Sequence, residues 1–242
     1  MIERRPIGIF DSGIGGLTVA RAINDLLPNE SLLYFGDTAH LPYGEKSPEL
    51  IRRYSSRITQ HLVESGCKAI VVACNSASSN AIGAIVKAAG PNMPVIDMVT
   101  PVIRSISAED GCQSVGLIGT RATITSGFYG EIMNQLNANS TLISRATPLL
   151  ASAIEEGFFN DSIPGAVLEA YFADDSFKNI DSMILGCTHY PLVRENVQAL
   201  LPKGVNVIDS PKIIAQELNR VLTENAYPYT PEHKIQVSDL TE

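Results

Sequence analysis

Two cysteines with the same sequence setting are the residues best suited to do chemistry in this chain. An apolar run over residues 69–73 ends at Cys74, and a second run over residues 182–186 ends at Cys187. Such runs are typical of buried parallel strands, and ligands bind at the carboxyl ends of these strands. A single cysteine placed there is usually inert core, but two built alike indicate a shared reactive site.

Two thiols that face each other across a site suit a chemically symmetric reaction. One thiolate removes a proton from one face of a carbon, and the other thiol delivers a proton to the opposite face. This inversion needs neither a metal nor a nicotinamide, so we expect no cofactor. A free thiol has a pKa of about 8.5, so a neighbouring group must help to form the thiolate. The candidates are Asp11 for Cys74, and His189 with Glu155 for Cys187.

Short apolar runs alternate with helical stretches in the first part of the chain, which predicts an α/β fold. We expect strands at residues 7–10, 31–35, 69–73 and 95–97, and helices at about 17–27, 48–65 and 76–89. This strict alternation is typical of a doubly wound parallel sheet.

The same pattern restarts near residue 114. The interval from Asp11 to Cys74 is close to that from Thr120 to Cys187, and each cysteine is followed by an apolar strand that ends in aspartate. Recurring landmarks indicate two pseudo-symmetric, doubly wound parallel-sheet domains that face a central cleft. In the second half we expect strands at residues 114–120, 141–144, 182–186 and 205–209, and helical stretches to about residue 137 and over about 151–173.

The domain boundaries follow from this repeat. Residues 1–98 and 211–242 are assigned to a discontinuous first domain, and residues 99–210 to the second. A last helix at about residues 212–225 is expected to pack back on the first half, and a polar tail follows it.

A glycine-rich segment, residues 11–18, joins the first strand to the first helix. Thr18 stands where the third glycine of a dinucleotide-binding turn would be, and no Gly-Lys-Ser/Thr follows as in a P-loop. The remaining backbone N–H groups at a helix start suit a small anion. A purely structural role, in which Asp11 caps the helix, is the alternative.

Composition excludes several classes of partner. The chain has 242 residues, with 18 basic and 26 acidic residues and a net charge of −8, which argues against nucleic acid and anionic membranes. No apolar run reaches the roughly 18 residues of a membrane span, and the N-terminus lacks the apolar region of a secretion signal. The four cysteines lack zinc-site spacing, so we expect free thiols, no metal and a cytoplasmic protein.

Four segments resemble the glutamate racemases of the aspartate/glutamate racemase family: residues 11–19, 42–44, 73–78 and 185–191. The resemblance implies a cofactor-independent enzyme that interconverts L- and D-glutamate and supplies D-glutamate for peptidoglycan and cell-wall synthesis. It implies that Cys74 and Cys187 exchange the protons, assisted by Asp11, His189 and Glu155. The expected substrate-binding positions are Asp11, Ser12, Asp37, Pro42, Tyr43, Gly44, Asn75, Ser76, Thr120, Thr188 and His189.

The chain departs from the family pattern at two places. Ser76 stands where the family usually has threonine; it keeps the hydroxyl and loses a methyl, which loosens binding slightly. The segment before Glu155 is atypical, so Glu156 stays open as an alternative to it.

Three other interpretations stay open from the sequence. A racemase for aspartate or a related amino acid would use the same pair of cysteines. A thiol hydrolase would use Cys187 as nucleophile and His189 as base, and would leave Cys74 idle. A non-catalytic amino-acid-binding module of two hinged lobes would explain a cleft but not the paired thiols. The expected partner is glutamate, with no nucleic acid and no membrane, and a homodimer is left open.

Overall fold

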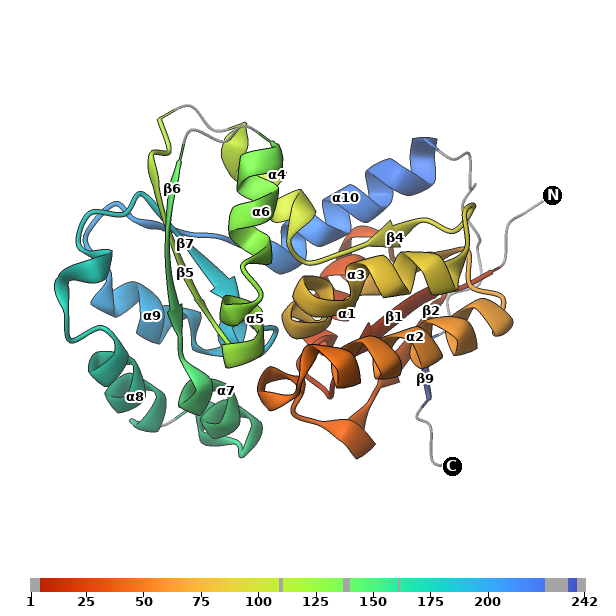
Figure 1. Ribbon diagram of the computed structural model, residues 1–242, viewed down its shortest axis with the longest axis horizontal. Coiled ribbons are helices and arrows are strands. Elements are labelled where there is room, and N and C mark those ends of the chain that lie inside the picture. The colour runs from red at the N-terminus through yellow and green to blue at the C-terminus, as the bar shows by residue number, and fades with distance from the viewer. Residues whose placement is uncertain (1–4, 109–110, 137–139, 161, 225–234, 239–242) are drawn as a thin grey trace.

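Two parallel sheets, each covered by helices, form the framework of the computed structural model (Figure 1). The structure describes residues 5–108, 111–136, 140–160, 162–224 and 235–238. The first sheet has the strand order β4-β3-β1-β2-β9 and the second has the order β6-β5-β7-β8. All strand pairs are parallel. The α/β fold with two doubly wound halves is therefore confirmed.

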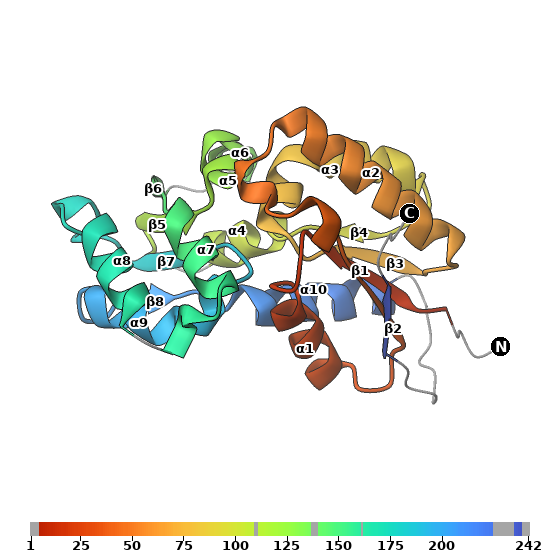
Figure 2. The same cartoon turned by 90° about the horizontal axis from the view of Figure 1, so that it is seen from below.

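The first half alternates strands and helices as expected. Its elements are β1 (Ile7–Asp11), α1 (Leu17–Leu26), β2 (Leu32–Gly36), the 3-10 turns η1 (Thr38–His40) and η2 (Tyr43–Glu45), α2 (Pro48–Glu64), β3 (Ala69–Val72), α3 (Asn75–Ala89) and β4 (Val95–Ile96). Every residue of β1, β2 and β3 is buried, because helices cover both faces of the sheet. Figure 2 shows α2 and α3 on one face and α1 with α10 on the other.

The second half repeats the arrangement around a four-stranded sheet. Its elements are α4 (Thr100–Ser107), β5 (Ser114–Gly119), α5 (Arg121–Thr125), α6 (Phe128–Gln135), β6 (Thr141–Ala146), α7 (Pro148–Glu155), η3 (Phe158–Asn160), α8 (Ile163–Tyr171), η4 (Asp175–Phe177), β7 (Ser182–Gly186), η5 (Tyr190–Val193), α9 (Arg194–Leu200) and β8 (Asn206–Val207). The order β4-β3-β1-β2 matches β8-β7-β5-β6 position by position. The two cysteine-bearing strands, β3 and β7, are therefore equivalent.

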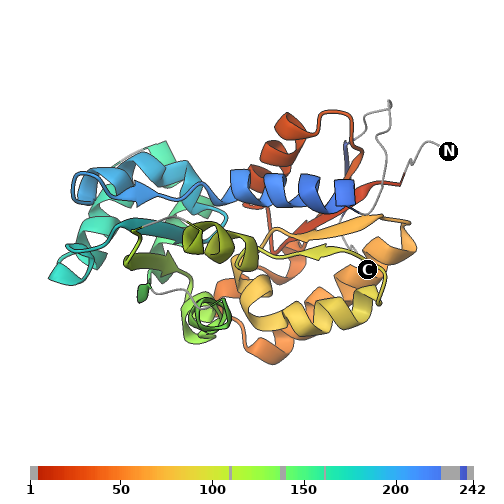
Figure 3. The same cartoon turned by 90° about the horizontal axis from the view of Figure 1, so that it is seen from above.

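The halves are joined by packing that the sequence repeat does not show. Helix α10 (Ser210–Glu224) lies against α1 and α4 at the junction (Figure 3). Arg104 of α4 donates a hydrogen bond to Glu217 of α10 at 2.9 Å. One apolar cluster runs through both halves, from Val71 of β3 to Ile184 of β7. Because this core is continuous, it holds the two sheets in a defined relation.

Several expected elements differ in the structure. The helical stretch expected to run to about residue 137 is two helices, because Gly127 adopts a left-handed conformation (φ 69°) between α5 and α6. Its expected end near residue 137 lies outside the described residues. Helices α4 and α9 were not predicted, although Pro101 in the first turn of α4 is a common start signal. The tail after α10, in which no strand was predicted, contains β9 (Ile235–Ser238), which pairs with β2. No helix of the described ranges is long and apolar enough to cross a membrane.

Candidate active site

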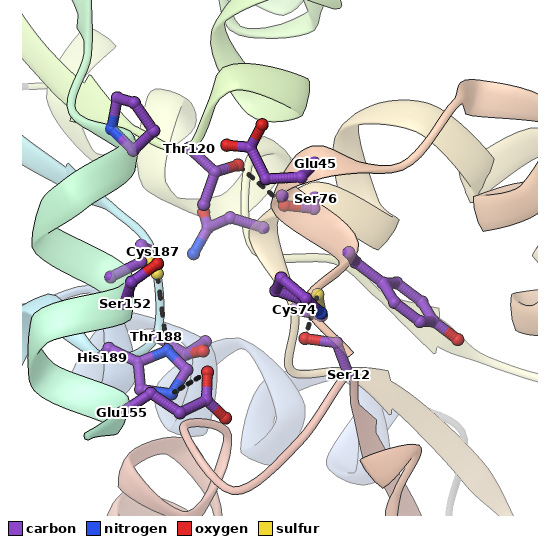
Figure 4. A pocket seen from close by; sticks show the side chains of 16 residues that line it. Ser12, Glu45, Cys74, Ser76, Thr120, Ser152, Glu155, Cys187, Thr188 and His189 are labelled. Atoms are coloured by element: carbon purple, nitrogen blue, oxygen red, sulfur yellow. Dashed lines mark hydrogen bonds and ion pairs between the residues drawn. The ribbon is translucent and has the colours of Figure 1, made fainter. Parts of the chain in front are cut away.

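A pocket of about 490 Å³, its open mouth included, lies between the two halves. The first half contributes the ends of β1 and β3 and the loop around η2, and the second contributes the ends of β5 and β7 and one face of α7. Cys74 and Cys187 lie on opposite walls (Figure 4). The lining residues are Ser12, Pro42, Tyr43, Gly44, Glu45, Cys74, Asn75, Ser76, Thr120, Pro148, Ala151, Ser152, Glu155, Cys187, Thr188 and His189.

Cys74 is held as a neutral thiol by its surroundings. It follows β3 after Ala73 and is the N-cap residue of α3, with 4% of its surface exposed. Burial, and then the negative charge of Asp11, raise the pKa of this thiol well above its ordinary value. Hydrogen bonds with the backbone of Ala77 and with Ser12, to whose Oγ the thiol donates at 3.7 Å, lower the pKa less than burial raises it. Cys74 is therefore suited to donate a proton in the resting state.

Cys187 has a different partner. It follows β7, and its sulfur lies 3.6 Å from Nδ1 of His189. Nε2 of that ring lies 3.6 Å from Oε2 of Glu155, which comes from the last turn of α7. Burial lowers the pKa of His189, but the hydrogen bond to Cys187 and the charges of Cys187, Asp11 and Glu155 outweigh burial and raise the pKa to about 9. A protonated imidazole therefore lies next to the Cys187 sulfur, within reach for proton exchange with it.

Polar groups from both halves meet at the back of the pocket. Oγ of Ser76 lies 2.9 Å from Oγ1 of Thr120, and the Tyr129 hydroxyl donates to Oδ1 of Asn75 at 2.6 Å. The buried Nδ2 of Asn75 has no hydrogen-bond partner within the described part of the chain. Since buried amide groups are rarely left unpaired, this donor is available to a ligand carboxylate. It stands at the N-terminus of α3, where the helix dipole also favours an anion.

Asp11 and Asp37 were expected to contact substrate, and neither lines the pocket. Oδ2 of Asp11 accepts hydrogen bonds from the backbone N–H groups of Gly13 and Gly16, at 3.2 and 2.9 Å. The carboxylate therefore holds the glycine-rich turn, and it does not cap α1, whose N-cap residue is Gly16 without a side-chain cap. Asp37 accepts a hydrogen bond from the Tyr43 hydroxyl at 2.5 Å, and it positions that pocket residue.

The structure also distinguishes Glu155 from Glu156. Glu155 lines the pocket beside His189, whereas Glu156 is exposed and outside the lining. Four lining residues were not predicted: Glu45, Pro148, Ala151 and Ser152. The signal for Ser152 was its i,i+3 spacing from Glu155, which puts both residues on one face of a helix.

Thr188 lies just before the 3-10 turn η5 and not at the start of an α-helix. A short 3-10 turn offers fewer aligned N–H groups than an α-helix. Among the described residues, no three His, Cys, Asp or Glu side chains are grouped so that they could hold a metal ion.

Comparisons with known proteins agree with this geometry. A sequence-family model described as Asp/Glu/hydantoin racemase matches residues 7–218. A glutamate racemase of Thermus thermophilus is 44% identical over 220 residues, which are 90% of this chain and 80% of the relative. The crystal structure of glutamate racemase from Francisella tularensis in complex with D-glutamate is similar with a TM-score of 0.89 and 37% identity, covering 99% of this chain and 90% of that chain.

A more distant neighbour shares only the fold. The aspartate racemase of Picrophilus torridus is similar with a TM-score of 0.64 and 18% identity, covering 92% of this chain and 99% of that chain.

Proposed function

The chain belongs to the Asp/Glu/hydantoin racemase family, and we propose that it interconverts L- and D-glutamate by proton transfer between two cysteines. The observation that carries this proposal is the pair of thiols in one pocket, with opposite surroundings. Cys74 lies where the neutral thiol is favoured, and Cys187 lies beside the protonated ring of His189, with which it can exchange a proton. A two-base inversion needs one group in each state at the start of a turnover.

The proposed steps follow from this difference. With L-glutamate bound, the Cys187 thiolate takes the α-proton from one face, and the Cys74 thiol delivers its proton to the other face. The α-carbon ends with the opposite configuration, Cys187 becomes a thiol and Cys74 a thiolate. D-glutamate reacts by the same steps in reverse. The assignment of Cys187 to the L-enantiomer and of Cys74 to the D-enantiomer rests on the family resemblance.

Neither lysine nor arginine occurs among the described lining residues of the pocket, so a dicarboxylic amino acid would be held by uncharged donors. The hydroxyls of Ser76, Thr120 and Thr188 and the free amide of Asn75 are suited to the two carboxylates. Buried hydroxyl and amide donors select strongly for a ligand that pairs with them. This supports glutamate, whose second carboxylate is one methylene further out than that of aspartate.

One observation favours a second candidate. Cys187, His189 and Glu155 form a chain with spacings of 3.6 Å and 3.6 Å, which resembles the nucleophile, base and orienting group of a thiol hydrolase. That function gives no role to the buried Cys74 on the facing wall. Incubation with L-glutamate followed by chiral chromatography tests the two functions, because only a racemase accumulates D-glutamate.

We expect turnover of glutamate to be well above turnover of aspartate, because the hydroxyl and amide donors would be left unpaired by the shorter side chain. We also expect no loss of activity with a metal chelator and no gain with pyridoxal phosphate. Chiral chromatography of parallel incubations with L-glutamate and L-aspartate measures the first expectation, and the same assay with each additive measures the second. A preference for aspartate, or inactivation by the chelator, would contradict the assignment.

Glutamate is also expected to protect the loop around η2 from hydrogen exchange. The loop contacts the second half: a Cβ added at Gly44 would lie 2.7 Å from Cβ of Thr120, and Glu45 lies 3.4 Å from Arg121. A ligand held by both halves would suppress opening of this contact. Mass spectrometry of residues 42–46 with and without saturating glutamate measures the effect, with α8 as the remote control. Equal exchange in both samples would argue against a site between the halves.

The wider role follows the same family. We propose that the enzyme acts in the cytoplasm and supplies D-glutamate for peptidoglycan. We further propose that residues 1–98 and 211–242 form one domain and residues 99–210 the other, and that the enzyme assembles as a homodimer. Sedimentation velocity with and without glutamate tests the last point.

A further inference from the structure

We infer that Gly15 is a positioning residue for His189. Only glycine at this position lets the glycine-rich turn of the first half pack closely against the imidazole that lies beside Cys187. The inference rests on the proposed function and concerns the same site. The glycine-rich turn would then position a residue of the second half, in addition to the anion binding or helix capping considered for it from the sequence.

The geometry at Gly15 leaves no room for a side chain. An added Cβ would lie 2.7 Å from Cε1 and 2.8 Å from Nδ1 of His189, and 2.7 Å from Oγ1 of Thr188. Ordinary contacts begin at 3.4 Å. A methyl group would therefore push directly on the ring nitrogen that lies 3.6 Å from the Cys187 sulfur.

The backbone of Gly15 does not itself require glycine. Its φ lies outside the left-handed region. The described glycines whose φ lies in that region are residues 66, 90, 111, 127, 157 and 204. Alanine can adopt such a backbone without strain. The requirement at position 15 therefore comes from the two side chains of the other half.

The turn cannot easily retreat from the ring. Thr18 donates a hydrogen bond from Oγ1 to the carbonyl of Gly15 at 2.9 Å, and the same oxygen lies 3.2 Å from the carbonyl of Thr188 in the second half. On the other side, the N–H of Gly16 is bonded to Asp11. Because the turn is anchored at both ends, a methyl at position 15 would displace the imidazole instead.

A neighbouring glycine supports the same role. A Cβ added at Gly13 would lie 3.2 Å from Oε1 of Glu155, the second partner of His189. The turn therefore lies along the Cys187–His189–Glu155 chain. Cys74 has its own hydrogen bond to Ser12 and none to His189. A change at Gly15 should therefore disturb one base and spare the other.

One-base elimination separates the two bases. The probes are the L- and D-enantiomers of 3-chloroglutamate. A thiolate takes the α-proton, the carbon–chlorine bond breaks with its electron pair leaving as chloride, and the enamine hydrolyses to 2-oxoglutarate and ammonium. Cys187→Ser and Cys74→Ser serve as references, expected to lose elimination from the L- and the D-probe respectively.

Gly15→Ala is expected to slow elimination from the L-probe by about 100-fold, the typical cost of misplacing a reacting group by about 1 Å, while the D-probe reacts as with the unchanged enzyme. Gly44→Ala would push on Thr120 instead of His189, and it controls for an effect caused only by moving the two halves apart. It should slow the reaction of both probes to the same extent. Gly83→Ala, with open space around it in α3, should change neither.

Equal loss with both probes in Gly15→Ala, or no loss, would overturn the inference while the cysteine references still behave as expected. If the references show no opposite preference, the proposed two-base function fails, and the inference fails with it. Should Gly15→Ala not fold, as judged by circular dichroism, Gly13→Ala replaces it. It should show the same preference with a smaller loss, and equal rates would again overturn the inference.

Discussion

Cys74→Ser and Cys187→Ser are each expected to abolish glutamate racemisation, although serine keeps nearly the same shape. A hydroxyl is several pKa units less acidic than a thiol, and each unit corresponds to about 1.4 kcal/mol of proton affinity, or about tenfold in rate. Both groups take part in every turnover, so neither variant retains a working direction. Chiral chromatography of the product from L- and from D-glutamate measures the loss.

Deuterated water adds a mechanistic readout to this prediction. The thiol that delivers the new proton has already exchanged its own proton for deuterium from the solvent. The original α-proton is transferred to the other cysteine. In the unchanged enzyme, deuterium should therefore enter the α-position of the product much faster than that of recovered substrate. Mass spectrometry of the separated enantiomers measures both rates.

Cys112→Ser is the matched control for the cysteine variants, because Cys112 lies outside the pocket lining and is half-buried. It should racemise glutamate as the unchanged enzyme does. Near-normal racemisation by Cys74→Ser would contradict the two-base mechanism, and the Cys187–His189 hydrolase would then become the better interpretation.

His189→Asn is expected to lower racemisation by about 10²- to 10⁴-fold, the usual contribution of a positioned acid or base. The pKa of His189 is raised to about 9, so the ring is protonated at neutral pH and loses its proton as the pH rises through 9. Above this pH the Cys187 thiolate loses its cationic partner. We therefore expect kcat/KM of the unchanged enzyme to fall above about pH 9, and the variant to lack that part of the fall.

The pH profiles of His189→Asn and of the unchanged enzyme must be compared, because the ammonium group of glutamate titrates in the same alkaline range. That titration is common to both enzymes, so the difference between their pH profiles belongs to His189. His61→Asn, on α2 outside the pocket lining, should keep the unchanged profile. Identical alkaline limbs for His189→Asn and the unchanged enzyme would show that His189 does not hold the relevant proton.

The chain order of apolar runs was enough to predict most of this fold. Strands buried on both faces read as continuous apolar runs, and the repeat around Cys74 and Cys187 follows from two copies of one strand order. Strand ends share one edge of a parallel sheet, so the positions after β1, β3, β5 and β7 were expected in one site. The pocket lining contains such residues from all four strands.

Other features had no periodic signal in the sequence. The break between α5 and α6 comes from the left-handed conformation of Gly127, and β9 pairs with the open edge of the first sheet at β2. The relation of the halves depends on α4 and α10, whose apolar faces meet only in the folded chain.

The residue types that do the chemistry were therefore determined by the sequence, since thiols, imidazole and carboxylates have fixed intrinsic reactivity. Their states were decided by the tertiary structure. Burial and the charge of Asp11 keep Cys74 a thiol, while hydrogen bonding and nearby charges keep the ring of His189 protonated beside the Cys187 sulfur. Both effects depend on burial and on distances of a few ångströms between the halves, including the close approach of Gly15 to His189. Spacing along a chain does not determine such distances, because they arise only when the two sheets pack together.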